Sequence, residues 1–168
     1  LKNEFHQDQE ASLNKGRDIK LNIDIESEKL ILDFINQNSK LPILSEESGA
    51  SNDLGDTYWI VDPLDGSSNY FRKIDICAVS IALMHQGEPL LGVINDFMNE
   101  HLYFASKNGG AFCNDISIKV SDIKDAAEGT IMTGIPAKSL YSDDEFKLMI
   151  ELFQKWKKVR MIGSAAIA

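Results

Sequence analysis

The sequence predicts an α+β fold in which a pair of helices packs on one large, mostly antiparallel sheet. Two segments with helical spacing of apolar residues stand before and after the middle of the chain. Between them, short β-rich runs alternate with turn-forming residues. No internal repeat, low-complexity tract or linker divides the 168 residues. This length suffices for one domain with a real core.

The first part of the chain leads into an amphipathic helix. Residues 1–13 are polar with sparse apolar points and predict the tail of a helix, and residues 15–18 predict a charged loop. A helix is expected over residues 24–38, because apolar residues recur there at helical spacing. Asp24 stands near its N-terminus, where a carboxylate suits the helix dipole.

The middle of the chain predicts antiparallel hairpins, because short apolar runs are separated by turn residues at 85–89 and 96–100. A last amphipathic helix follows before a final strand. The expected strands span residues 78–84, 90–95, 101–105, 129–133 and 159–162, and the last helix spans 143–156.

Composition narrows the classes of function. The chain carries 26 acidic and 17 basic residues, a net charge of −9, which argues against nucleic acid as a main partner. Cys77 and Cys113 form no disulfide framework. No run approaches the roughly 18 apolar residues of a membrane span, and no signal peptide is visible. We therefore expect no membrane partner and a cytoplasmic location.

The segment from Trp59 to Tyr70 is the most informative part of the sequence. An apolar run leads into Asp62 and Asp65, and a Gly-Ser-Ser-Asn turn follows at once. A buried strand would deliver both carboxylates to the edge of a sheet, and the small residues would let a helix begin. Mg²⁺ binds through a few carboxylates plus substrate phosphate, and a helix N-terminus attracts anions. The segment therefore predicts metal and phosphate chemistry side by side.

A second acidic element lies upstream, where residues 41–45 lead into Glu46 and Glu47. Taken alone, the Asp-Pro-Leu-Asp-Gly segment is typical of an ordinary turn, because Asp, Pro, Gly, Ser and Asn are the usual turn formers. Two short apolar runs that both end in carboxylates favour a functional site instead.

The Glu-Glu-Ser-Gly element at 46–49, the Asp-Pro-Leu-Asp-Gly-Ser-Ser-Asn element at 62–69 and the apolar run at 77–83 resemble the inositol monophosphatase family. This family is the Mg²⁺-dependent, lithium-sensitive branch of the sugar phosphatases. The resemblance runs from about Asp18 to the last residue. It implies the N-terminal lobe of an αβαβα sandwich.

The resemblance also implies a ligand set. Glu46, Asp62 and Asp65 would hold two or three Mg²⁺ ions, with Asp62 bridging and the carbonyl of Leu64 completing one shell. Glu47 would be a further catalytic residue, either as an additional metal contact or as a support for the metal ligands. Mg²⁺ ions bound in this way would cancel the repulsion between a negatively charged protein and a phosphate ester.

The remaining expected roles concern substrate and water. Phosphate oxygens would bind the N–H groups of Gly66 and Ser67, and Asp65 would also contact substrate. The hydroxyl of Ser67 and the carboxylate of Asp24 would orient or deprotonate the attacking water. A helix-capping role for Asp24 is an equally weighted alternative from the residues alone.

The end of the chain predicts a second lobe. By the resemblance, Gly163, Ser164 and Ala165 open a helix that faces the phosphate site, so they should lie near Asp65 and bind substrate. The family's further metal ligand, usually in a Trp-Asp pair, does not occur in these 168 residues. We therefore expect residues 1–158 to form the metal- and phosphate-binding lobe and residues 159–168 to begin a truncated C-terminal lobe. An uncovered apolar surface there predicts aggregation or a homodimer.

The substrate is predicted from the Ser68-Asn69-Tyr70 segment, which follows the pattern of inositol monophosphatases. Inositol-1-phosphate, hydrolysed to inositol and phosphate, is the expected substrate. Phosphoadenosine-phosphate and fructose-1,6-bisphosphate are the alternatives within the superfamily. A non-catalytic, metal-binding pseudo-phosphatase is the alternative from another class.

Overall fold

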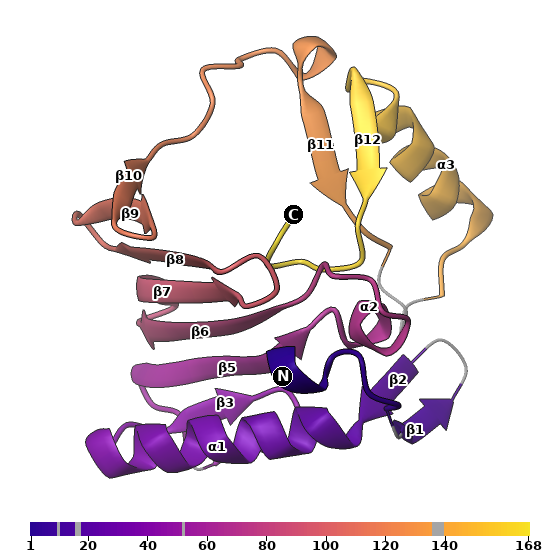
Figure 1. Cartoon of the computed structure of the whole chain (residues 1–168). Coiled ribbons are helices and arrows are strands. Elements are labelled where there is room, and N and C mark those ends of the chain that lie inside the picture. The colour runs from indigo at the N-terminus through magenta and orange to yellow at the C-terminus, as the bar shows by residue number, and fades with distance from the viewer. Residues whose placement is uncertain (10, 16–17, 52, 136–139) are drawn as a thin grey trace.

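The computed structural model describes residues 1–9, 11–15, 18–51, 53–135 and 140–168. An eight-stranded mixed sheet dominates the molecule, and a two-stranded parallel sheet and a two-stranded hairpin lie beside it (Figure 1). The large sheet has the strand order β10-β9-β8-β7-β6-β5-β3-β4. Its strands are β3 (Ile43–Ser45), β4 (Gly49–Ala50), β5 (Thr57–Asp65), β6 (Ala78–His85), β7 (Glu88–Asp96), β8 (His101–Ser106), β9 (Gly110–Cys113) and β10 (Ile116–Ile118).

Neighbouring strands of this sheet are antiparallel, except that β3 and β5 run parallel. The long strands β5, β6, β7 and β8 follow one another along the chain, as the hairpin pattern of the sequence predicts. The parallel pair needs a longer connection, and the short strand β4 and a loop supply it.

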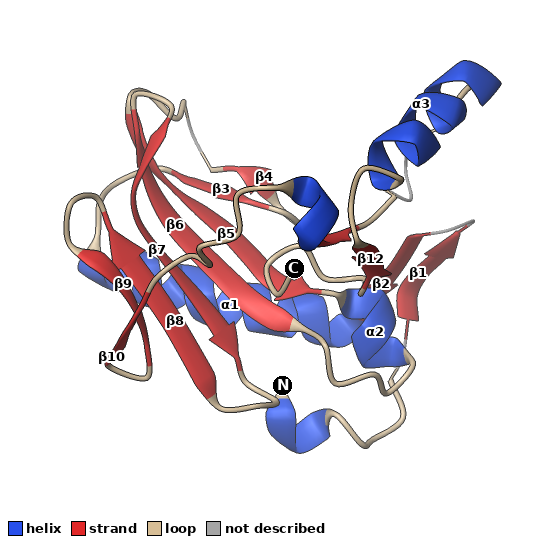
Figure 2. Cartoon of the chain, turned by 90° about the horizontal axis from the view of Figure 1, so that it is seen from above, coloured by secondary structure: helices blue, strands red, loops and turns tan. Residues whose placement is uncertain are grey.

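Helix α1 (Asn22–Asn38) crosses one face of the large sheet and lies behind the strands in Figure 2. Its apolar face contributes Ile35, which packs with Ile43 of β3 and Val61 of β5 in a buried cluster. This packing fixes the helix against the two strands that carry the acidic residues.

A second core lies where β5 meets helix α2 (Ser67–Phe71). Tyr70 is fully buried there, and its ring meets those of Phe5 and Phe97 edge to face. The hydroxyl of Tyr70 donates to the carbonyl of Leu1 at 2.7 Å. The N-terminal segment is thus attached to the helix that follows the acidic motif.

The last third of the chain builds the parallel sheet from β11 (Thr130–Thr133) and β12 (Lys158–Met161). Helix α3 (Asp143–Phe153) connects the two strands and lies beside β12 (Figure 1). The remaining elements are β1 (Ala11–Lys15), β2 (Asp18–Leu21) and the 3₁₀ turns η1 (Lys2–Glu4) and η2 (Ala126–Glu128).

The predicted α+β class and the mostly antiparallel large sheet are confirmed. The two expected helices are present, but they are divided between the sheets, α1 on the large one and α3 beside β12. The prediction of a helix tail over residues 1–13 is wrong, because this stretch holds η1 and most of β1. Residues 16 and 17 of the expected charged loop lie outside the described residues.

The boundary expected at residue 158 coincides with the start of β12, whose only sheet partner among the described strands is β11. The second sheet therefore draws on residues that precede this boundary, from 130 onward. The division of the chain into lobes stays a prediction. No described helix is both long and apolar enough to cross a membrane.

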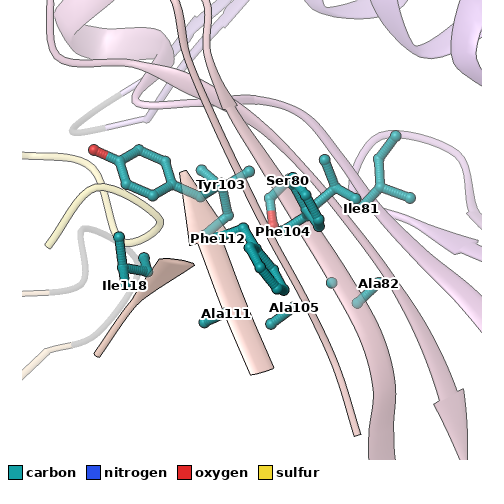
Figure 3. Close-up of a pocket in the computed structure, with 12 residues that line it drawn as sticks. Ser80, Ile81, Ala82, Tyr103, Phe104, Ala105, Ala111, Phe112 and Ile118 are labelled. Carbon is teal, nitrogen blue, oxygen red and sulfur yellow. The ribbon is translucent and has the colours of Figure 1, made fainter. Parts of the chain in front are cut away.

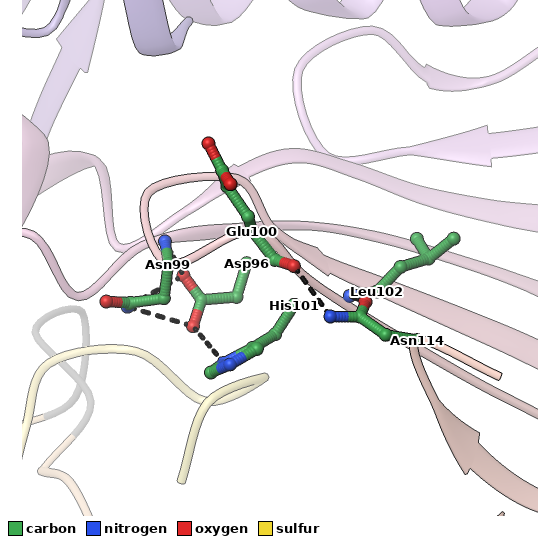
Figure 4. A network of polar contacts seen from close by, with 6 residues as sticks. All are labelled: Asp96, Asn99, Glu100, His101, Leu102 and Asn114. Atoms are coloured by element: carbon green, nitrogen blue, oxygen red, sulfur yellow. Dashed lines mark hydrogen bonds and ion pairs between the residues drawn. The ribbon is translucent and has the colours of Figure 1, made fainter. Parts of the chain in front are cut away.

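A network of polar side-chain contacts surrounds the turn between β7 and β8 (Figure 4). Buried Asp96 accepts from the backbone N–H and the side-chain amide of Asn99 and faces Nδ1 of His101 at 3.8 Å. Asn114 donates to the carbonyl of Glu100 at 2.9 Å. Asp96 is therefore a buried carboxylate with local partners, and it stabilises a turn.

Candidate active site

The acidic residues are brought together by the parallel pairing of β3 and β5. Ser45 stands opposite Val61, and the N–H of Glu46 donates to the carbonyl of Val61 at 3.1 Å. Glu46 and Asp62 therefore follow paired residues on neighbouring strands. Sixteen positions separate them in the sequence, yet the sheet register makes them neighbours.

The environment of Asp62 shows the effect of this crowding. Burial, the nearby negative charges of Glu46 and Asp65 and a hydrogen bond to Glu46 raise the pKa of Asp62 to about 8. The N–H of Leu64 donates to Asp62 Oδ1 at 3.1 Å, and this hydrogen bond lowers the pKa of Asp62. Like charges so close together disfavour ionisation unless a cation balances them.

Asp65 has different partners. The pairing of β5 with β6 shifts register between Asp62 and Asp65, so the strand is irregular where the two aspartates stand. One oxygen of Asp65 accepts from the N–H of Ala165 at 3.0 Å, and the other accepts from the Ser164 hydroxyl and from the N–H of Ala166 at 3.1 Å. Asp65 thus joins the motif to a turn about one hundred residues later.

This turn holds the expected segment of Gly163, Ser164 and Ala165 close to Asp65. Ser164 is buried, and its hydroxyl also accepts from the N–H of Ile167 at 3.2 Å. The segment forms a single turn at residues 165–167 in place of the expected helix. Its roles toward substrate stay predictions.

Gly66 allows the chain to leave β5 and begin α2. It adopts φ 85° and ψ 32°, and a Cβ atom there would lie 2.9 Å from the carbonyl oxygen of Ile76. This left-handed conformation is easily adopted only by glycine. Ser67 then opens α2, directly after the two aspartates.

Asn69 is a connecting residue that the sequence did not reveal. Its side-chain amide donates to the carbonyls of Ile76 at 2.8 Å and of Ile162 at 2.7 Å. A Cβ atom on Gly163 would collide with the Asn69 side chain at 2.8 Å. Asn69 therefore connects α2 to the strand end that precedes the C-terminal turn. Its place in the motif was the only available signal.

Asp24 and Glu47 lie on the two elements around this centre. Asp24 is buried in the first turn of α1, and its Oδ2 accepts from the N–H of Leu21 at 2.8 Å. This bond fits the helix-capping role that the sequence allows for Asp24. Glu47 is half-buried in the turn between β3 and β4. The pairing of Asp24 with Ser67 and the metal contact of Glu47 stay predictions.

The oxygen atoms of the acidic side chains are suitable ligands for a hard divalent cation. Glu46 is exposed, Asp62 is half-buried beside it, and both offer the oxygen ligands that Mg²⁺ prefers. Among the described residues, no three His, Cys, Asp or Glu side chains are gathered as a ready metal cluster. Both oxygens of Asp65 accept hydrogen bonds from the C-terminal turn.

A cleft of about 780 Å³ opens beside the motif. Its lining combines Glu46 and Asp65 with Ser164 and with Thr133 at the end of β11. A second hollow of about 250 Å³ lies on the face of β6 to β9, where the rings of Phe104 and Phe112 stack 5.2 Å apart (Figure 3). That hollow has no charged side chain in its lining, whereas the cleft beside the motif contains Glu46 and Asp65 and is therefore the candidate site.

Comparison with known proteins gives a consistent result. The model of the inositol monophosphatase family matches residues 1–168. The Nus factor SuhB of Pasteurella multocida is 33% identical over 167 residues, which cover 98% of this chain and 62% of that protein. The chain therefore spans about three fifths of the length of this curated relative.

Solved structures show the same architecture. The extragenic suppressor protein suhB of Bartonella henselae superposes with a TM-score of 0.83 at 30% identity, covering 97% of this chain and 64% of that one. The IMPase of Thermotoga maritima superposes with a TM-score of 0.80 at 28% identity, covering 96% of this chain and 62% of that one.

Proposed function

The chain belongs to the inositol monophosphatase family, and we propose that its acidic centre serves Mg²⁺-dependent hydrolysis of a phosphomonoester. The observation that carries the proposal is the placement of Glu46 beside Asp62 by the parallel strands. Burial of Asp62, together with the negative charges of Glu46 and Asp65, raises the pKa of Asp62 to about 8. A group of carboxylates that repel one another in the absence of a cation is suited to binding one.

Each residue of the centre has a proposed task. Glu46, Asp62 and the carbonyl of Leu64 would hold Mg²⁺, with two or three ions in the full site. Asp65 would join them when its carboxylate exchanges its bonds to the C-terminal turn for a metal contact. When bound, Mg²⁺ would supply the positive charge that balances a phosphate ester and its leaving oxygen. Glu47 would complete the negative surroundings.

The residues after the motif would handle phosphate and water. The N–H groups of Gly66 and Ser67 would donate to phosphate oxygens. The Ser67 hydroxyl would position the attacking water, and the carboxylate of Asp24 would accept its proton through that hydroxyl.

We propose inositol-1-phosphate as the substrate. The Ser164 hydroxyl and the N–H of Ala165 lie at the cleft beside Asp65, where they would meet the hydroxyls of a polyol. Gly163 leaves room there for the Asn69 side chain. Phosphoadenosine-phosphate and fructose-1,6-bisphosphate are the alternative substrates.

A phosphate-release assay tests this function. The purified protein is supplied with each of the three substrates, with Mg²⁺ and with EDTA, and the Asp62→Asn variant serves as the negative control. We expect Mg²⁺-dependent turnover that is fastest with inositol-1-phosphate and is inhibited by lithium. Equal release by the wild-type protein and the Asp62→Asn variant would remove Asp62 from the mechanism.

A non-catalytic, metal-binding role is the second candidate. It is favoured by the name Nus factor of the SuhB relative and by the engagement of both Asp65 oxygens with the C-terminal turn. Binding of Mg²⁺ in calorimetry without turnover of any of the three substrates would support this candidate against the enzyme.

Three further properties belong to the proposal. We expect a homodimer, because exposed apolar side chains such as Leu148 and Met161 stand on and beside the second sheet. We expect a cytoplasmic location, and a small phosphorylated molecule in place of nucleic acid as the main ligand. Sedimentation at several concentrations and a filter-binding assay with RNA and DNA measure the first and the last of these.

A further inference from the structure

Helix α1 contacts both acidic elements through two consecutive side chains. Oε1 of Glu28 accepts from the N–H of Ser48 at 3.0 Å and from its hydroxyl at 3.2 Å. The hydroxyl of Ser27 donates to the carbonyl oxygen of Pro63 at 3.1 Å. Ser48 follows Glu46 and Glu47, whereas Pro63 lies between the two aspartates. One turn of the helix is thus bonded to both halves of the proposed metal site.

The two segments need such support because the sheet holds them weakly at these points. Residues 46–48 form the turn between β3 and the two-residue edge strand β4, which pairs with β3 alone among the described strands. Pro63 lies in the irregular part of β5, where the register with β6 shifts, and proline has no N–H to donate. Backbone pairing alone therefore leaves both acidic segments incompletely restrained.

The burial of Glu28 indicates that its hydrogen bonds with Ser48 belong to the folded core and are not an incidental surface contact. Only 6% of Glu28 is exposed, although it is a glutamate on a helix whose neighbours Glu26 and Lys29 are exposed. A buried carboxylate is costly unless it is hydrogen-bonded, and Glu28 accepts two hydrogen bonds from Ser48. The cost of burial is thus offset by bonds to the acidic turn.

We propose that Glu28 is a positioning residue, which sets the place of Glu46 relative to Asp62 through Ser48, with Ser27 fixing the other side through Pro63. The proposal rests on the proposed function and adds a determinant of metal affinity to it. The carboxylate of Glu28 acts as a hydrogen-bond acceptor and touches neither metal nor substrate. Residues that orient metal ligands in this way typically change metal affinity 10–100-fold when they are replaced.

The test separates metal affinity from the chemical step. Mg²⁺ affinity is measured by calorimetry, and kcat is measured at saturating Mg²⁺ with inositol-1-phosphate. Glu28→Ala is expected to weaken Mg²⁺ binding about tenfold or more, with kcat at saturating Mg²⁺ within about threefold of the wild type. Glu28→Gln keeps the acceptor oxygen and should restore most of the affinity. Glu26→Ala, on the exposed face of the same helix, is the matched control.

Unchanged Mg²⁺ affinity in Glu28→Ala, beside an active wild-type protein, would overturn the positioning role and leave the proposed function intact. A wild-type protein that neither binds Mg²⁺ nor releases phosphate would overturn both. Where Glu28→Ala does not fold, Ser48→Ala decides, because it removes one of the two bonds. The proposal is supported if Ser48→Ala binds Mg²⁺ more weakly than the wild type while Ser48→Thr binds it as tightly as the wild type. The same Mg²⁺ affinity in Ser48→Ala and Ser48→Thr would contradict the proposal.

Discussion

At the scale of single residues, the chain places charges where they are costly without a cation. Asp62 is half-buried, bonded to Glu46 and close to Asp65, and its pKa rises to about 8. A carboxylate that ionises freely in the unfolded chain, with a pKa of 3.8, therefore keeps its proton in the metal-free folded protein. The folded state binds more protons than the unfolded state between about pH 4 and pH 8, so its stability falls as the pH rises through this window.

We predict that Asp62→Asn removes Mg²⁺-dependent turnover and raises the stability of the metal-free protein at pH 8.5. Each kcal/mol of repulsion relieved should raise Tm by about 2–4 °C. Thermal unfolding in EDTA at pH 5 and pH 8.5 measures this effect, which should be larger at the higher pH. Addition of Mg²⁺ should raise Tm of the wild type alone. A variant that is less stable than the wild type at pH 8.5 would contradict the crowding of carboxylates.

Ser67 allows a second prediction at this scale. Ser67→Ala should lower kcat about 10²–10⁴-fold, because the proposed hydroxyl that orients the water is lost, while Mg²⁺ affinity stays within about twofold. Single-turnover kinetics and calorimetry provide the two measurements. Ser68→Ala is the control, since Ser68 is the exposed neighbour on the same helix. An unchanged kcat in Ser67→Ala would reduce this residue to the start of α2.

At the scale of elements, the backbone between the end of β5 and the start of α2 shapes the candidate site. The strand becomes irregular at the aspartates, and Gly66 then turns the chain so that α2 begins immediately. The turn is tight because the carbonyl of Ile76 and the side chain of Cys77 pack against Gly66. Burial raises the pKa of the Cys77 thiol to about 12, so this cysteine stays a neutral packing group.

We predict that Gly66→Ala destabilises the protein by more than about 1–2 kcal/mol, because the left-handed backbone and a collision act together. Gly87→Ala is a matched control: Gly87 has φ 79°, but its Cβ would meet nothing within 4 Å. Urea denaturation of both variants isolates the collision at the Ile76 carbonyl. Equal losses of stability would show that the contact at Gly66 relaxes without cost.

At the scale of the whole molecule, the large sheet and the parallel sheet meet at the proposed site. Asp65 and Asn69 reach from the motif to Ser164 and to Ile162, across more than ninety residues of chain. The cleft beside the motif is lined by residues next to both sheets, among them Glu46 after β3 of the large sheet and Thr133 of β11 in the parallel sheet. A ligand in this cleft would therefore contact both parts of the chain.

Asn69→Ala should loosen this connection without altering Mg²⁺ binding. The carbonyls of Ile76 and Ile162 lose their donor, which costs about 1–3 kcal/mol for each carbonyl that stays unsatisfied. Hydrogen exchange should quicken in β12 and hardly change in β6. Asn114→Ala, which breaks a similar amide contact in the turn after β9, is the control. Unchanged exchange in β12 would show that the Asn69 amide does not hold the two sheets together.

The sequence by itself determined the class of fold and located the acidic residues of the candidate site. Apolar spacing located α1 and α3, and the hairpin pattern located β6, β7 and β8, because burial of one face imposes a period that can be read locally. The acidic segments were equally visible, since Glu46, Asp62 and Asp65 each follow or end a short apolar run. Local signals failed over residues 1–13, where few apolar residues define a period.

Only the tertiary structure decided which side chains meet. The parallel register of β3 and β5 places Glu46 beside Asp62, and no local pattern encodes the register of strands joined by a loop. The bonds of Glu28 to Ser48, of Asn69 to Ile162 and of Asp65 to Ser164 join residues 20 to 99 positions apart. Such contacts arise from the packing of whole elements, so a sequence read along its length names the reactive groups but not the residues that hold them in place.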